Sequence, residues 1–225
     1  MAVAHENGAA EVIGLDLSLG GLLHARALLN GTGSFHLVQG DIIRPPFQRG
    51  AFNVVYSIGV IHHLASPKAG LLALESLLCP GGSLWIWVYG LEGMSLVYRL
   101  SHLVWLRRFT RSWSLQAKFR LSRLLALAFG TYYLTPLRLL HGLLPSSVMG
   151  FLPFEGLTRS NYEDVAYAFF DRLQPPYTHY LRKADLQEWL ARLESVSIEA
   201  PNKRGWVAKG RRPEDENNTR QLGEK

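Results

Sequence analysis

Two adjacent histidines, His62 and His63, are the clearest candidates for acid–base chemistry in this chain. Imidazole titrates near neutral pH, so either ring can act as a general base beside a reacting group. The pair makes a poor metal site, because neighbouring side chains diverge and no further Cys/His cluster completes a ligand set. The alternative is structural, with both rings capping and packing the start of a helix. No metal is expected, and the two other roles stay open.

The histidines lie between two segments that are predicted to be strands. Residues 54–56 form an apolar run short enough for a strand buried on both faces, and residues 84–89 form another. Ser66 followed by Pro67 is typical of an N-cap and the first position of a helix. Leucines at helical spacing come next, and a Pro-Gly-Gly turn at 80–82 is predicted to end that helix.

Strand, loop, helix, turn and strand together make one βαβ unit. In sheets of this kind, ligands bind in the crevice at the carboxyl ends of the strands. The loop 57–63 lies at that end, and Gly59 within it lets the backbone approach a ligand closely. The sequence therefore predicts an α/β fold with a crevice beside the histidines.

Residues 57–64, Ser-Ile-Gly-Val-Ile-His-His-Leu, and residues 79–82, Cys-Pro-Gly-Gly, carry a family resemblance. The chain resembles the class I S-adenosylmethionine-dependent methyltransferases of the type 11 branch. In that family an S-x-G-V-L-H-H-L stretch follows the fourth strand, and a K/R-P-G-G turn precedes the fifth. The resemblance is best over residues 11–90 and extends over about 10–212. It implies a Rossmann-like sheet, mostly parallel with an antiparallel closing strand, and S-adenosyl-L-methionine as cofactor.

The resemblance also implies where the cofactor binds. An acid at the end of the family's second strand accepts hydrogen bonds from the ribose hydroxyls, and an acid after the third strand takes the adenine amino group. Asp16 and Asp41 stand at these positions. A carboxylate can accept two hydroxyl donors at once, although both aspartates could instead cap local backbone. The implied cofactor-binding residues are Asp16, Leu17, Asp41, Ile42, Ser57, Ile58 and Gly59.

A second stretch concerns the methyl acceptor. Residues 169–171 and 175–180 are predicted to form a loop rich in aromatic and polar side chains. Methyltransferases with a comparable cap carry a P-x-Y-x-H-Y-like stretch, so the resemblance places Tyr177, His179 and Tyr180 beside the acceptor. A return loop that stacks on the sheet is the alternative. The candidate catalytic residues are His63, His62, Tyr177 and His179.

Residues 91–150 differ from the rest of the chain in charge. They hold eight Lys or Arg residues and one acid, Glu92, among segments rich in Leu, Trp and Phe. These segments predict two or three helices, interrupted at Thr135-Pro136 and inserted after the fifth strand. A cap over the crevice is one interpretation, and peripheral membrane contact is the other, because basic, aromatic and leucine side chains suit an interfacial helix. No RNA-binding signature is present, so nucleic acid is not the expected partner.

Length and composition limit the classes of protein to which this chain can belong. The chain has 225 residues, 48% of them hydrophobic, and a formal net charge of +6. Its single cysteine excludes an internal disulfide and favours a reducing, cytoplasmic compartment. No signal peptide is visible after Met1, and no uncharged apolar run reaches the roughly 18 residues of a membrane span.

The family's first strand and glycine-rich loop should precede Asp16 by roughly twenty residues. Only fifteen residues do so here, and none matches, so we expect a core that is truncated at its N-terminus. The predicted parts are a core segment 1–90, a helical insertion 91–175, a second core segment 176–212 and a flexible tail 213–225. The expected activity is methyl transfer to a small-molecule or lipid-like acceptor. The alternative is an inactive remnant that acts as a binding or membrane-surface module.

Overall fold

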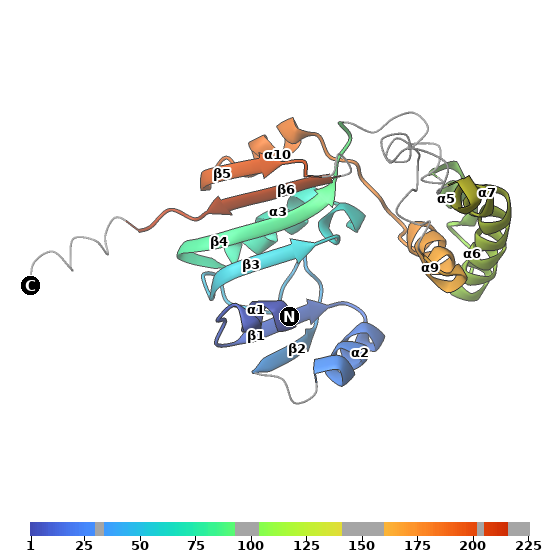
Figure 1. Ribbon diagram of the computed structural model, residues 1–225. Helices are drawn as coiled ribbons and strands as arrows, with labels where there is room; N and C mark the ends of the chain where they lie inside the picture. Colours follow the sequence, from blue (N-terminus) through green and yellow to red (C-terminus); the bar gives the residue numbers. More distant parts are fainter. Residues whose placement is uncertain (30–33, 93–103, 141–159, 202–204, 216–225) are drawn as a thin grey trace, which may run out of the picture. The chain divides into compact units, whose positions relative to one another are not determined.

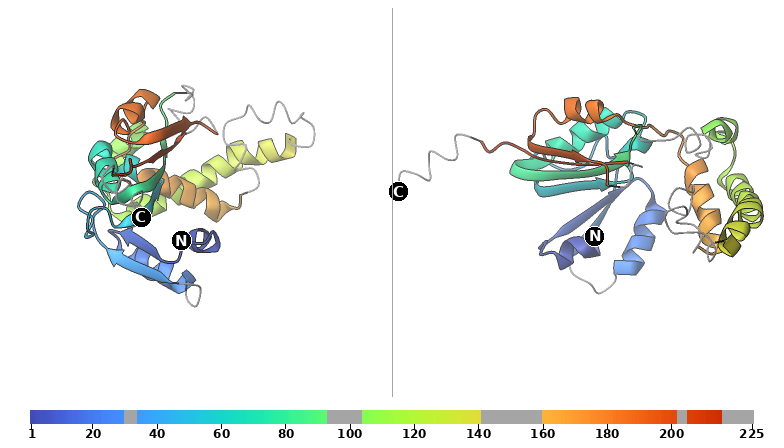
Figure 2. Two further views of the ribbon diagram at one scale, coloured as in Figure 1. Left: turned by 90° about the vertical axis from the view of Figure 1, so that its left-hand side faces the viewer. Right: turned by 45° about the horizontal axis from the view of Figure 1, so that its top comes forward.

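The computed structural model forms two compact units (Figures 1 and 2). Unit 1 consists of Met1–Glu92 and His179–Lys225, and unit 2 of Gly93–Thr178. The residues that the structure describes are 1–29, 34–92, 104–140, 160–201 and 205–215.

A four-stranded sheet is the centre of unit 1 (Figure 1). Its strands stand in the order β3-β4-β6-β5 and span Phe52–Ile58, Leu78–Tyr89, Gly205–Arg211 and Glu194–Glu199 respectively. β3 and β4 are parallel, whereas β6 runs antiparallel to both of its neighbours. The predicted βαβ unit and antiparallel closing pair are confirmed.

The crossover from β3 to β4 contains the short helix η1, Ile61–His63, and the helix α3, Pro67–Ser76. Ser66 caps α3 as predicted, because its Oγ accepts a hydrogen bond from the N–H of Ala69 at 3.3 Å. This local signal places the start of the helix correctly.

The Pro-Gly-Gly turn at 80–82 does not end that helix. α3 ends earlier, and β4 already begins at Leu78. Phe52 pairs with Leu78, but Val54 pairs with Ser83, so the intervening residues of β4 form a bulge opposite β3. The glycine in the middle of the turn has a φ of +75°, which glycine adopts without steric cost.

One face of the four-stranded sheet carries the core of unit 1. The helices α3 and α10, Lys183–Trp189, pack their leucines against side chains of β3, β4 and β6 on this face. Successive residues of a strand point to opposite faces, and Val55 is 8% exposed while Val54 is 57% exposed. The prediction that residues 54–56 are buried on both faces is therefore wrong for the described structure, because these two helices cover only one face.

A separate two-stranded parallel sheet is made of β1, Val12–Asp16, and β2, Phe35–Gln39. The helix α2, Leu19–Leu29, connects them, and the hydroxyl of Ser18 accepts a hydrogen bond from an N–H of its first turn at 3.2 Å. A short N-terminal helix, α1 (Ala2–Glu6), precedes β1 and was not expected from the sequence.

The break between the two sheets falls between β1 and β3. Each of these strands is an edge strand among the described residues. In Figure 1 the arrows of β1 and β3 point the same way, so their carboxyl ends lie toward one side of unit 1. The resemblance places the family's first strand between these two edges, and the described part of the chain provides no strand there.

Unit 2 is helical. Its helices are α5 (Val104–Thr110), α6 (Leu115–Phe129), η2 (Gly130–Leu134, a π-helix), α7 (Thr135–Leu140) and α9 (Tyr162–Leu173). A small core joins α6 and η2 to α9, formed by Ala126, Leu134, Val165 and Ala166 with three aromatic rings packed around them. Figure 1 shows α6 beside α9.

Two local predictions in unit 2 are wrong. Pro136 does not interrupt the helix, because the π-turn η2 precedes it and the hydroxyl of Thr135 donates to the carbonyl oxygen of Gly130 at 2.9 Å. This geometry accommodates a residue without an N–H. Residues 169–171 lie in α9, not in a loop, and the helix begins with a capping box between Asn161 and Asp164.

No helix among the described residues is both long and apolar enough to cross a membrane.

Candidate cofactor and acceptor site

Asp16 and Asp41 come to the same end of neighbouring strands. Asp16 is the last residue of β1 and pairs with Gln39, the last residue of β2. The N–H of Gly40 donates to the carbonyl oxygen of Asp16 at 3.0 Å, which holds the next residue, Asp41, close to the end of β1. Parallel pairing thus brings together two carboxylates that are far apart in the sequence.

Each carboxylate uses one oxygen in a local cap. Asp16 Oδ1 accepts a hydrogen bond from the N–H of Ser18 at 2.8 Å, and Asp41 Oδ1 accepts one from the N–H of Ile43 at 2.9 Å. No hydrogen bond within the described part of the chain uses either Oδ2. Both side chains are exposed. The capping role and a ligand role are therefore compatible.

Gly21 of α2 lies beside the carboxylate of Asp16. A Cβ on Gly21 would lie 3.4 Å from Asp16 Oδ2. Free carboxylate oxygens of this kind accept hydrogen bonds from vicinal hydroxyls or an amino group. The residues present therefore fit the ribose and adenine edges of S-adenosyl-L-methionine.

At the end of β3 and directly after it, Ser57, Ile58 and Gly59 differ in their surroundings. Ser57 is buried on the helix-covered face, and its Oγ has no hydrogen-bond partner in the described structure. Ile58 is exposed on the opposite face. Gly59 has a φ of +79° and donates its N–H to the carbonyl oxygen of Trp87 at 3.0 Å. A ligand at this strand end would meet the side chain of Ile58 and the backbone of Gly59.

The other two implied cofactor residues differ in exposure. Leu17 is exposed, and its carbonyl oxygen accepts a hydrogen bond from Gln39 Nε2 at 3.1 Å. Ile42 is half-buried and packs against the core of unit 1. Its position follows directly from Asp41, whose carboxylate caps the same turn.

An aromatic cluster surrounds the predicted histidines at the end of β4. The ring of His62 lies 4.0 Å from that of Tyr89 and 4.2 Å from that of His63, measured between centroids. Tyr180 stacks on Tyr89 at 5.8 Å, and Trp87 meets the edge of Tyr89 at 5.4 Å. His62 is fully buried, whereas His63 is half-buried. Of the two histidines, His63 is thus the more accessible to an acceptor.

The sequence singled out the histidines but not Trp87 and Tyr89. Aromatic residues alternate at the end of the strand that follows the histidine loop, and this alternation could have indicated both residues. Alternation places Trp87 and Tyr89 on the face opposite the helices, since Ile86 and Val88 are buried in the core.

The predicted acceptor stretch is divided between the two units. The N–H of His179 donates to the carbonyl oxygen of His62 at 2.8 Å, so His179 and Tyr180 join the aromatic cluster of unit 1. Tyr177 belongs to unit 2, where its hydroxyl lies 3.5 Å from Arg111 Nη2 and its ring lies under that guanidinium. The roles of these residues toward an acceptor stay predictions.

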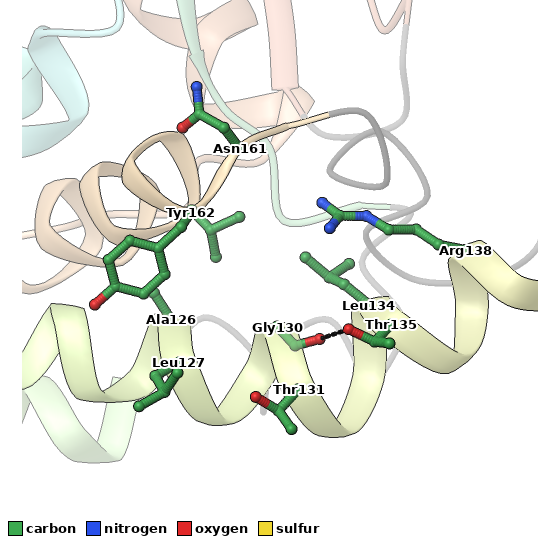
Figure 3. Close-up of a pocket in the computed structure, with 10 residues that line it drawn as sticks. Ala126, Leu127, Gly130, Thr131, Leu134, Thr135, Arg138, Asn161 and Tyr162 are labelled. Carbon is green, nitrogen blue, oxygen red and sulfur yellow. Dashed lines mark hydrogen bonds between the residues drawn. The ribbon is translucent and has the colours of Figure 1, made fainter.

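A cavity of about 170 Å³ lies in unit 2, and none of the residues predicted for the site lines it (Figure 3). It is bounded by α6, η2, α7 and the start of α9, and Arg138 at its rim donates to the carbonyl oxygen of Ser160 at 2.5 Å. Ligand pockets usually measure about 300 to 1,000 Å³. The cavity is therefore too small for the cofactor. The described residues also form no group of three or more metal-ligating side chains.

Comparison with known proteins identifies the N-terminal segment. Residues 1–86 match the model of the family described as "Methyltransferase domain". An uncharacterised protein of Synechococcus sp. is 34% identical over 105 residues, which are 45% of this chain and 25% of that protein. A protein of Encephalitozoon cuniculi, whose methyltransferase activity is itself inferred, is 33% identical over 37% of this chain and 40% of its own length.

A solved structure has a similar fold. The CMeT domain of the citrinin polyketide synthase aligns over 95% of this chain and 42% of its own, with a TM-score of 0.51 and 9% identity. At that identity the likeness concerns the fold alone. Residues 1–86 are thus similar in sequence to a methyltransferase domain, and the described fold is similar to that of a solved methyltransferase domain. The chain matches only about a quarter and two fifths of the length of the two curated relatives.

Proposed function

We propose that this chain binds S-adenosyl-L-methionine and transfers its methyl group to a small-molecule or lipid-like acceptor. The observation that carries the proposal is the pair Asp16 and Asp41 at adjoining strand ends, within a segment that matches a methyltransferase domain. Each carboxylate keeps one oxygen outside its local cap.

When bound, the cofactor supplies a methyl group on a positively charged sulfur. Asp16 would hold the ribose hydroxyls and Asp41 the adenine amino group, while Ile42 and Ile58 provide apolar contact. His63, the more exposed of the two histidines, would accept a proton from the acceptor. The acceleration of methyl transfer would come chiefly from orienting the cofactor and the acceptor in line. Direct transfer of this kind needs no covalent enzyme intermediate.

Titration calorimetry with S-adenosylhomocysteine tests the cofactor site. We expect measurable binding that weakens at least tenfold in Asp16→Ala, since a hydrogen bond to a charged group contributes about 1.5–3 kcal/mol. Glu11→Ala is the matched control, because Glu11 is an exposed acid directly before the start of the same strand. Equal weakening by both substitutions would contradict the assignment of Asp16.

The alternative function is an inactive methyltransferase-like module that binds a partner or a membrane. The break between β1 and β3 favours it, because these edges flank the predicted crevice and neither is paired on that side in the described structure. Absence of S-adenosylhomocysteine binding by the folded chain would support this alternative. Cofactor binding together with methylation of a lipid or small-molecule extract by labelled S-adenosyl-L-methionine would exclude it.

A further inference from the structure

The turn that joins α5 to α6 in unit 2 has an unusual surface. Residues 108–115, Arg-Phe-Thr-Arg-Ser-Trp-Ser-Leu, are here called the α5–α6 corner. Three of its large apolar side chains are open to solvent: Phe109 is 69% exposed, Trp113 46% and Leu115 58%. Large exposed apolar side chains this close in the sequence are candidates for an interaction surface.

The charge of the corner and of the segment 104–140 that contains it has one sign, whereas α9, which packs against α6, carries the acids Glu163, Asp164 and Asp171. Arg108 and Arg111 stand within the corner and are exposed. Across the described residues 104–140 there are seven basic side chains and no acid. The surface would therefore attract an anionic partner over a distance of about a Debye length, 8–10 Å at ordinary ionic strength.

The corner has a defined conformation that keeps these side chains outward. The N–H of Trp113 donates to the carbonyl oxygen of Thr110 at 3.0 Å, and the buried hydroxyl of Thr110 donates to the carbonyl oxygen of Leu106 at 3.1 Å. Ser114 then caps α6 by accepting from the N–H of Ala117 at 3.2 Å. Because these hydrogen bonds already order the corner, binding would cost little conformational entropy, which favours docking.

We propose that the α5–α6 corner docks on an anionic membrane surface, with Phe109, Trp113 and Leu115 entering the interface and Arg108 and Arg111 contacting lipid headgroups. Indole and phenyl rings prefer the boundary between headgroups and acyl chains. Cations beside them add attraction to anionic lipid. Such contact lies in the plane of the surface and requires no membrane-spanning helix.

Vesicle co-sedimentation of the full chain tests the proposal without any cofactor, so its outcome is independent of the proposed methyl transfer. We expect stronger pelleting on phosphatidylcholine vesicles that contain phosphatidylglycerol than on phosphatidylcholine alone, and loss of the difference at high salt. Arg108→Gln with Arg111→Gln should weaken binding about 30-fold at low salt, taking about 1 kcal/mol for each cation. Phe109→Ser with Trp113→Ser should weaken binding to both kinds of vesicle.

Matched controls come from α2 in unit 1. Leu28→Ser removes an apolar side chain that is 71% exposed, and Arg26→Gln removes an exposed cation. Neither should change pelleting. Circular dichroism of each variant checks that the helices remain folded.

A second measurement locates the contact at the corner itself. Brominated lipids should quench tryptophan fluorescence in the wild type, and Trp113→Phe should reduce that quenching while pelleting persists. Equal, negligible pelleting on all vesicles would overturn the proposal. Salt-sensitive binding of an oligonucleotide, with no vesicle binding, would also overturn it and assign the cations to nucleic acid.

Discussion

Glu75 shows how burial acts on a single residue of the α/β core. It lies on α3, and its Oε2 is buried without a hydrogen-bond partner in the described structure. Burial raises the pKa of the Glu75 carboxyl, and the charges of Arg192 and Arg212 only partly oppose this effect. The folded protein therefore holds the protonated form more readily than the unfolded chain does.

A pH series of Glu75→Gln tests this account. Because the folded pKa is raised, the stability gained from Glu75 is complete below its ordinary value of 4.5 and is lost as pH rises through the folded pKa. We expect Glu75→Gln to be more stable than the wild type at pH 7, with the difference shrinking toward pH 4. Urea unfolding at several pH values measures it.

Glu188→Gln provides the comparison. Glu188 forms an exposed ion pair with Lys68 at 2.7 Å, and such pairs contribute less than about 1 kcal/mol. A stability gain at pH 7 in Glu188→Gln as large as that in Glu75→Gln would contradict the burial argument.

At the scale of the element, β3 is the strand on which the site depends. Its buried face rests on α3 and α10, while Val54, Tyr56 and Ile58 on the other face are exposed. The same face continues onto β4, where Trp85 is exposed. The centroid of its ring lies 4.2 Å from Lys209 Nζ. An apolar sheet face left open to water is a surface that another segment or partner could cover.

Substitution of two neighbouring valines measures whether that face is covered in solution. Val55→Ala should cost about 2 kcal/mol of unfolding free energy, because it removes buried methyl groups. Val54→Ala should cost less than about 0.5 kcal/mol, since its side chain is 57% exposed. Equal costs, from denaturant unfolding of both variants, would mean that the face is buried in solution.

At the scale of the whole molecule, the two units have separate cores of different size. The core of unit 1 spans β3, β4, β6, α3 and α10, whereas the described residues of unit 2 form a smaller core between α6, η2 and α9. Burial in unit 2 also raises the pKa of the Tyr133 hydroxyl. Separate cores predict that the chain does not unfold in one cooperative step.

Scanning calorimetry should therefore resolve two transitions. Leu134→Ala removes a buried side chain of unit 2 and should lower only the transition of that unit, by about 2–5 kcal/mol in stability. Leu71→Ala should do the same for unit 1 alone. A single transition that both substitutions lower equally would show that the two cores unfold together.

Local chemistry by itself determined much of this protein. The caps at Ser18 and Ser66, the strands and the helical spacing of the leucines depend on residues three or four positions apart, so a sequence pattern is enough to predict them. The family resemblance, not local spacing, singled out Asp16 at the end of β1 and Asp41 shortly after β2. The signal for α9 was also present, in Asn161 and Asp164, but the aromatic residues after it suggested a loop.

The tertiary structure alone decided which distant residues meet. It left one face of β3 uncovered, separated β1 from β3, and brought the ring of Tyr89 against those of His62 and Tyr180. These outcomes follow from pairing and packing between segments tens of residues apart. The spacing of residues within one segment predicts whether it forms a helix or a strand. It does not predict which other element will cover the apolar face of that segment.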